Sequence, residues 1–213
     1  TYLVSERENL YSSPAIRIAG RRAMELAGLS PEKIDLVDLY SCFPSAVQIA
    51  ARELGFPLDR PLTVTGGLTF GGGPLNNYVM HSISRMVTLL RENRTKKGMI
   101  TANGGFLTKH SFGIYSAIPP IREFQYENLQ AEVNEMPTRE SVTDYEGPAT
   151  LESYTVMFAN ENPEIGHCAC LTPEGKRTWA NVTDNGVLKL MQVEEFCGRQ
   201  VFIDGKGTLL FKA

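Results

Sequence analysis

The spacing of apolar residues changes once along this chain of 213 residues, after the pair Pro119 and Pro120. Before the two prolines, apolar residues recur mostly at helical intervals, with short alternating stretches between them. Beyond Ala149, short runs rich in β-branched and aromatic residues are separated by turn residues such as glycine and proline. Because helices and strands need different apolar periods, we predict two structural units, of which the second is largely β.

The first part of the chain shows a helix, strand, helix order with short connections. Residues 14–28 form an amphipathic stretch that starts at a proline and ends at a glycine, as helices commonly do. Apolar and acidic residues alternate over 34–40, which is typical of a strand, and a second helical stretch starts at Pro44 and runs to about Gly55. This order favours a layered α/β fold.

Glycines are frequent at two places, one before a predicted helix and one at the end of a predicted strand. The sequence TGGLTFGGGPLNNY precedes an amphipathic stretch over about 78–92, and a short predicted strand over 98–103 ends in Gly104 and Gly105. In α/β proteins, loops at the carboxyl ends of strands commonly bind ligands through backbone N–H groups. The alternative is that these glycines serve only to make tight turns.

A polar stretch over 121–148 separates the two patterns and is typical of a domain boundary. We therefore expect an α/β domain over 1–120, a linker over 121–148 and an additional C-terminal domain over 149–213. The short strands of the last part predict a small all-β barrel or sandwich, with an OB-like barrel as one possible form.

Charge and composition exclude some classes of protein. The formal net charge is -3, and neither Lys and Arg nor Asp and Glu gather into a long run, so no nucleic-acid partner is expected. No apolar run approaches the roughly 20 residues that span a bilayer, and we expect no membrane span. Four irregularly spaced cysteines favour a reducing, cytoplasmic setting. A chain that begins at Thr1 is expected to be processed, trimmed or partial.

Three short motifs occur in order along the first part: DLVDLYSCF, GGLTFGGGP and ITANGG. In order and approximate spacing they resemble three active-site loops from the C-terminal half of the thiolase superfamily. With an additional β-domain at its C-terminal end, the chain looks most like the thiolase-like proteins of type 1, which are similar to acetyl-CoA acetyltransferases. The resemblance implies an α/β thiolase-like C-terminal half with a layered, mixed sheet.

The resemblance also implies a ligand and a partner. Members of the superfamily handle acyl-CoA in lipid metabolism, so CoA or an acyl-CoA is the expected substrate or ligand, and no further cofactor is implied. The family's nucleophilic cysteine lies in an N-terminal half that this sequence does not contain. Either the chain is a fragment, or it works with a separately encoded thiolase-like subunit.

Three positions that carry proton transfer or oxyanion binding in the family hold other residues in this sequence. Tyr40 stands where the family has an Asn or His that helps to bind the thioester oxygen. Gly73 stands where the family has its catalytic His, and Ala102 where it has the second Cys. Neither glycine nor alanine exchanges a proton, so the isolated chain is expected to be inactive as a thiolase.

The shape of the site is expected to persist without these groups, because small residues leave room for a pantetheine chain to approach the backbone. The residues expected to border such a ligand are Tyr40, Phe43, Gly72, Gly73, Pro74, Asn103, Gly104 and Gly105.

Two other residues are candidates for replacement chemistry. Cys42 lies just before the helix that starts at Pro44, where helix-terminal N–H groups lower the pKa of a thiol, although a small buried loop residue is the simpler interpretation. His110 follows the ITANGG motif and is a candidate base; a packing or surface histidine is the alternative. His81, within the predicted helix, is interpreted as structural.

In the C-terminal part, His167, Cys168, Cys170 and Cys197 suggest a zinc site at first sight. On a strand, however, the two nearby cysteines share one face and the histidine points to the other, so a further ligand would be needed. We predict no metal. Trp179 is interpreted as a core or interface aromatic rather than as part of a surface for single-stranded nucleic acid.

Two functions remain open at this point. One is an acyl-CoA-handling thiolase-like protein with altered catalytic loops. The other is a non-catalytic CoA-binding or assembly module that pairs with an active partner.

Overall fold

The computed structural model describes residues 3–211, and contacts divide the chain into two compact units. We call residues 11–136 the α/β unit, and residues 3–10 together with 137–211 the β unit. Residues 3–10 make their contacts with the β unit, and the division after residue 136 lies within the polar stretch over 121–148.

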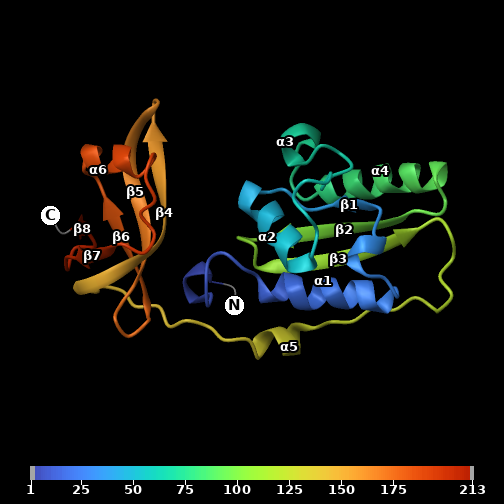
Figure 1. Cartoon of the computed structure of the whole chain (residues 1–213), viewed down its shortest axis with the longest axis horizontal. Helices are drawn as coiled ribbons and strands as arrows, with labels where there is room; N and C mark the ends of the chain where they lie inside the picture. The colour runs from blue at the N-terminus through green and yellow to red at the C-terminus, as the bar shows by residue number, and fades with distance from the viewer. Residues whose placement is uncertain (1–2, 212–213) are drawn as a thin grey trace. The chain divides into compact units, whose positions relative to one another are not determined.

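A three-stranded mixed sheet forms the centre of the α/β unit, in the order β1-β2-β3 (Figure 1). Its strands are β1 (Leu36–Asp38), β2 (Lys97–Gly104) and β3 (Lys109–Ser116). Strand β1 runs parallel to β2, and β2 runs antiparallel to β3. This confirms the expected mixed sheet.

The helices of this unit are α1 (Pro14–Leu26), α2 (Pro44–Leu54), the short α3 (Leu68–Gly71), α4 (Tyr78–Glu92) and α5 (Gln130–Asn134), with a 3-10 turn η2 (Pro31–Lys33). The first begins where the sequence predicts, because Ser13 accepts a hydrogen bond from the backbone N–H of Ile16 and a proline occupies the first turn. The second ends at Gly55, whose φ of 81° suits a residue without a side chain.

Helices cover both faces of the sheet, as alternate residues of β2 show. Met99 packs with α1 and α2 in one apolar cluster, whereas its neighbour Ile100 packs with α4 in another. Helices α1 and α2 approach closely at Gly20, where an added Cβ would lie 2.2 Å from a methyl carbon of Leu54. The unit is therefore a three-layer α/β structure.

The β unit is built on a five-stranded antiparallel sheet in the order β6-β5-β4-β7-β8. Its elements are η1 (Val4–Glu6), β4 (Gly147–Ala159), β5 (Asn162–Leu171), β6 (Arg177–Val182), α6 (Asn185–Leu190), β7 (Gln200–Ile203) and β8 (Leu209–Phe211). The two outer strands meet: Asn181 of β6 pairs with Thr208, and its N–H donates to the carbonyl of Gly207 at 2.8 Å. The sheet thus curls into a small, partly open barrel, as an OB-like domain does.

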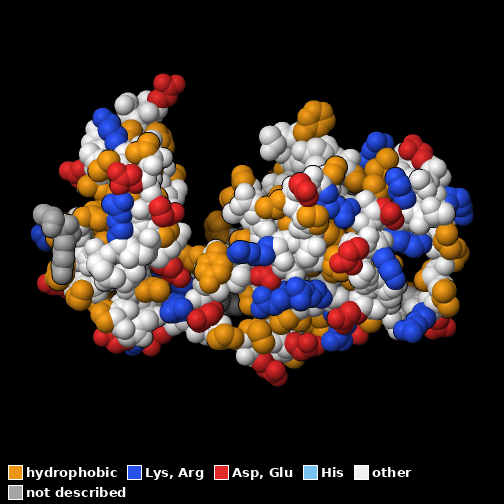
Figure 2. All heavy atoms as spheres, viewed as in Figure 1, with side chains coloured by type: hydrophobic (Ala, Val, Ile, Leu, Met, Phe, Trp, Pro, Cys, Tyr) orange, Lys and Arg blue, Asp and Glu red, His pale blue; other side chains and the backbone are white. Residues whose placement is uncertain are grey.

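Residues 3–10 lie against this barrel. Arg7 pairs with Thr138 as an isolated antiparallel bridge, and the N–H of Arg139 donates to the carbonyl of Glu6 at 2.8 Å. The β unit therefore combines two parts of the chain that are far apart in sequence. Figure 2 shows basic and acidic side chains intermixed over the face in view. Among residues 3–211, no helix has the length and apolar character needed to cross a bilayer.

Candidate active site

The three loops that resemble thiolase active-site loops lie at one edge of the sheet in the α/β unit. Because β1 and β2 are parallel, the loop after β1 (residues 40–43) and the end of β2 with the turn that follows it (residues 103–106) lie at the same edge. The glycine loop (residues 66–74) follows a segment that runs along β1, where the N–H of Leu39 donates to the carbonyl of Leu62 at 2.9 Å.

A buried carboxylate, that of Asp38 at the end of β1, joins the strand to the glycine loop and to α4. One of its oxygens accepts hydrogen bonds from the hydroxyl of Thr63 at 2.8 Å, the N–H of Val64 at 2.9 Å and the hydroxyl of Thr65 at 3.3 Å. The other accepts from the hydroxyls of Tyr78 at 3.0 Å and Ser82 at 2.6 Å. Neutral donors thus solvate a carboxylate that is 0% exposed.

The loop after β1 contacts both of the other loops. The hydroxyl of Ser41 accepts a hydrogen bond from the N–H of Leu68 in the glycine loop at 2.8 Å. The N–H of Tyr40 donates to the hydroxyl of Thr101 on β2 at 2.9 Å. An added Cβ at Gly67 would lie 2.8 Å from the Ser41 hydroxyl, so only glycine allows this approach.

Asn103 links the first and third loops and places His110. Its amide nitrogen donates to the carbonyl of Tyr40 at 3.4 Å, and its Oδ1 lies 2.9 Å from Nδ1 of His110. The other imidazole nitrogen lies 3.2 Å from the carbonyl oxygen of Leu107, and the ring stacks on Phe112. Both ring nitrogens therefore face oxygen atoms that accept hydrogen bonds, so the imidazole acts here as a hydrogen-bond donor.

Cys42 lies in this site, and its surroundings oppose activation of the thiol. Burial raises its pKa, and a hydrogen bond with Asn103 only partly opposes that effect. Burial likewise raises the pKa of Tyr40, whose ring meets the edge of the Tyr78 ring with 5.5 Å between centroids. Both shifts favour the protonated forms of these groups.

The glycine loop and the loop after β2 project apolar side chains into solvent. Phe70 is 85% exposed, Leu75 is 94% exposed and Phe106 is 70% exposed. Gly72 has φ of +69°, and Gly73 and Pro74 are exposed beside it. Large exposed apolar side chains are typical of surfaces that bind a ligand or another protein when they form one continuous patch.

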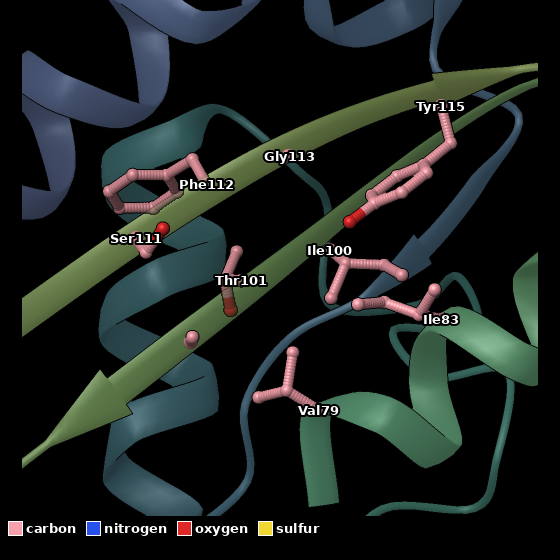
Figure 3. A pocket seen from close by; sticks show the side chains of 9 residues that line it. Val79, Ile83, Ile100, Thr101, Ser111, Phe112, Gly113 and Tyr115 are labelled. Carbon is pink, nitrogen blue, oxygen red and sulfur yellow. The ribbon is translucent and has the colours of Figure 1, made fainter. Parts of the chain in front are cut away.

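A cavity of about 210 Å³ lies between α4 and the sheet (Figure 3). It is lined by Val79, Ile83, Ile100, Thr101, Ala102, Ser111, Phe112, Gly113 and Tyr115. Ala102, the residue at the family's second-cysteine position, thus borders a space with both polar and apolar walls. The ring of Tyr115 leans over Gly113, where an added Cβ would lie 2.8 Å from the ring, and burial raises the pKa of this tyrosine.

The remaining sequence candidates lie elsewhere. His81 is half-buried on α4 beside Tyr78. In the β unit, His167 bonds Asn181, whereas Cys168 and Cys170 belong to the apolar core and burial raises the pKa of each to about 12. Within residues 3–211 no three His, Cys, Asp or Glu side chains come together as metal ligands.

Sequence reasoning missed Asp38 and Ser41. The alternation in IDLVDLY predicts a strand and assigns no role to its acidic residues, but a parallel strand covered on both faces buries both of its sides. A usable signal was present. Asp38 at a strand end is an acceptor, and the later segment LTVTGG contains hydroxyl groups that can donate to it.

Comparison with known proteins gives matches to both units. The model of the thiolase C-terminal domain-like family matches residues 1–59, and that of the thiolase-like protein type 1 additional C-terminal domain matches residues 128–208. A solved structure, that of a monomeric SCP2-thiolase-like protein type 1 from Mycobacterium smegmatis, is 32% identical with a TM-score of 0.88. The alignment covers 99% of this chain and 48% of that protein, so the chain spans about half of its relative's length.

The likeness in fold and sequence therefore extends across the α/β unit, with its three loops, and the barrel that follows it. The chain is thus similar to thiolase-like proteins: a region that matches the thiolase C-terminal domain-like family precedes one that matches the additional C-terminal domain of thiolase-like protein type 1.

Proposed function

We propose that this chain supplies one side of an acyl-CoA-binding cleft in a thiolase-like protein of lipid metabolism. The observation that carries the proposal is that the three loops meet at one sheet edge. Two hydrogen bonds join them: the amide of Asn103 donates to the carbonyl of Tyr40, and the hydroxyl of Ser41 accepts from the N–H of Leu68. Loops fastened in this way are pre-organised, which lowers the entropic cost of binding a ligand.

The site is better suited to binding than to thiolase turnover. Gly73 and Ala102 carry no group that exchanges a proton, and the raised pKa of Cys42 keeps its thiol protonated. A positioned acid or base contributes about 10²–10⁴-fold in rate, so the loss of two such groups removes most of the family's rate enhancement. His110 lies 2.9 Å from Oδ1 of Asn103, and we assign it a hydrogen-bonding role toward the loops.

A second candidate function is assembly with another thiolase-like half or subunit, with no ligand. The observation that favours it is the exposure of Phe70, Leu75 and Phe106 on the same loops. The two functions are compatible when a partner closes the cleft over the ligand. A cytoplasmic location stays a prediction from the cysteine pattern.

Calorimetric titration with CoA and with a long-chain acyl-CoA tests the proposal, on this chain and on the chain joined to an N-terminal thiolase-like half. We expect binding in the joined form, weakened by Asn103→Leu, which unlinks the loops. Asn93→Ala, at the end of α4, is the matched control and leaves binding unchanged. Absence of heat at millimolar ligand in both forms would refute the binding function and leave assembly as the function.

A further inference from the structure

We propose that the outer face of β6 in the β unit is a binding site for an extended peptide, and that residues 3–10 of the chain occupy it. The additional C-terminal domain then acts as a clamp on the segment that leads into α1. We call Arg139, Glu152, Arg177 and Trp179 the Arg177 clamp. This inference does not rest on the acyl-CoA proposal, because it concerns a different unit.

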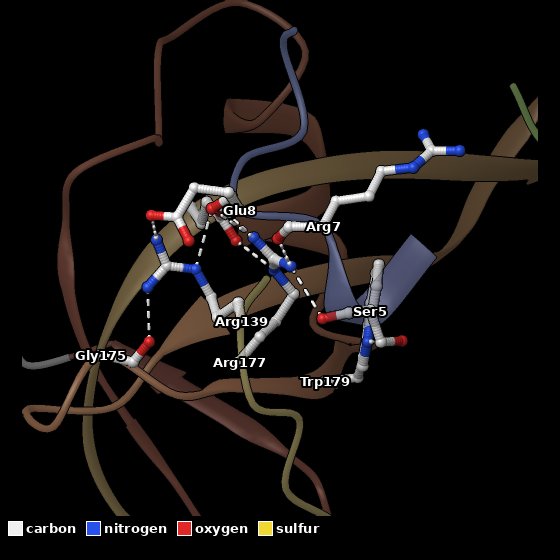
Figure 4. A network of polar contacts seen from close by, with 8 residues as sticks. Ser5, Arg7, Glu8, Arg139, Gly175, Arg177 and Trp179 are labelled. Atoms are coloured by element: carbon white, nitrogen blue, oxygen red, sulfur yellow. Dashed lines mark hydrogen bonds and ion pairs between the residues drawn. The ribbon is translucent and has the colours of Figure 1, made fainter. Parts of the chain in front are cut away.

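The position of Arg177 on β6 is the first evidence. Thr178, Ala180 and Val182 point into the barrel and are buried, so the alternate positions, Arg177 and Trp179, belong to the outer face. A side chain on an outer face is normally exposed, but Arg177 is 0% exposed. It is covered because residues 5–8 and Glu152 lie over it (Figure 4).

The contacts of Arg177 show how the segment is gripped. Its Nε and Nη2 donate to the two carboxylate oxygens of Glu152 at 2.6 and 2.7 Å, a fork that fixes the plane of the guanidinium. Its Nη1 donates to the carbonyl of Ser5 at 2.8 Å and to that of Arg7, and Nη2 lies 3.4 Å from the carbonyl of Glu8. Backbone carbonyls are the acceptors, so this part of the grip suits any extended peptide.

Two side chains of the segment add selectivity. The indole N–H of Trp179 donates to the hydroxyl of Ser5 at 3.0 Å. Arg139 donates from Nη2 to the carboxylate of Glu8 at 3.0 Å and from Nε to the carbonyl of Glu8 at 2.9 Å, and its Nη1 donates to the carbonyl of Gly175. The clamp therefore fits a peptide with a hydroxyl residue followed three positions later by a carboxylate.

The same face binds oligonucleotides and oligosaccharides in other OB-like barrels. In this chain a peptide segment already lies against part of it, and the indole N–H and both guanidinium groups donate hydrogen bonds to that segment. A peptide segment is therefore the occupant that the observed contacts support, and competition by single-stranded nucleic acid is an outcome that the test includes.

The chain offers its own reporter, because Trp179 is its single tryptophan. A specific protease site inserted between Leu10 and Tyr11 allows the segment to be cut from an otherwise complete chain. We expect the cut segment to co-elute with the rest of the chain at high micromolar concentration and tryptophan emission to stay unchanged. Loss of the segment on gel filtration, with circular dichroism unchanged, would overturn the proposal.

Competition tests the selectivity. An excess of the synthetic peptide LVSERENL is expected to displace the cut segment, whereas the peptide carrying Ser5→Ala and Glu8→Gln is expected to compete at least about tenfold less well, since it lacks a charge-assisted contact. Equal competition by both peptides, or displacement by a single-stranded oligonucleotide alone, would contradict a peptide site.

The uncut chain gives a test that does not depend on the insertion. Arg177→Gln would leave Glu152 unpaired and endanger folding, so Arg139→Gln is the chosen variant, with Lys189→Gln on α6 as the matched control. We expect Arg139→Gln to speed hydrogen exchange in residues 3–10 and to shift Trp179 emission, with the core strands unaffected. Unchanged exchange in the segment would count against the clamp.

Discussion

The carboxylate of Asp38 lies 2.6 Å from the hydroxyl of Ser82, and both residues are 0% exposed. The same carboxylate accepts hydrogen bonds from the segment that leads into the glycine loop. One side chain thus sets the position of α4 and of that loop relative to β1, although it is not among the residues expected to border a ligand.

Replacement of Asp38 tests this arrangement. Asp38→Ala leaves several buried donors without an acceptor and is expected to lower the free energy of unfolding by about 3 kcal/mol. Asp38→Asn should cost less, about 1 kcal/mol, because the hydroxyls of Tyr78 and Ser82 can turn to accept from the new amide while its oxygen still serves the N–H of Val64. Urea unfolding measures both, with Asp59→Asn as the control; equal losses for the two variants would contradict the account.

The close approach of α1 and α2 gives a second prediction. Gly20→Ala places a methyl group 2.2 Å from the Leu54 side chain, and the overlap is expected to destabilise the chain by about 1–2 kcal/mol despite the better helix propensity of alanine. The double variant with Leu54→Ala makes room for the new methyl, so its loss of stability should be smaller than the sum of the two single losses. Additive losses would show that the two residues do not interact.

Alkaline pH is expected to destabilise the β unit through its buried thiols. Burial raises the pKa of Cys168 and of Cys170 to about 12 in the folded chain, whereas unfolded thiols titrate near about 8.5. Between about pH 9 and 12 the unfolded state has therefore lost protons that the folded state retains, so stability falls as pH rises, by up to about 1.4 kcal/mol per pH unit and thiol. Stability at pH 8 and at pH 10 should differ less in Cys170→Ala than in the original chain; an unchanged difference would refute this.

Turnover provides a fourth prediction. The chain alone is expected to show no thiolysis of acetoacetyl-CoA, because neither Gly73 nor Ala102 transfers a proton. The rate of thiolysis is measured from the acetyl-CoA that is released. A rate on the order of 1 per second or faster would show that another residue performs the proton transfer.

Local sequence signals predicted the helices well. Pro14 and Pro44 begin α1 and α2, and Gly55 follows the end of α2, because proline and glycine act through backbone geometry that needs no tertiary context. Strand β3 went unrecognised, since KHSFGIYS contains polar residues and a glycine, and only its pairing with β2 makes it a strand.

Contacts between residues far apart in the sequence could not be predicted from local sequence patterns. Nothing in the composition of residues 3–10 indicates that Arg177 binds them. The donor is an arginine side chain and the acceptors are backbone carbonyls, which every residue has, so only the fold determines that they pair. The partners of Asn103 were unpredictable for the same reason: the three loops were placed in order along the chain, but their hydrogen bonds depend on the shared sheet edge.

The separation of 172 positions between Ser5 and Arg177 has a consequence for biosynthesis. Residues 3–10 emerge from the ribosome well before β6 exists, and at about 5–20 residues per second they wait on the order of ten seconds for their partner. Closing so long a loop costs conformational entropy, so this contact is expected to form slowly. During that interval the segment lacks the Arg177 side chain as a hydrogen-bond donor, so its capture by the barrel follows the synthesis of β6.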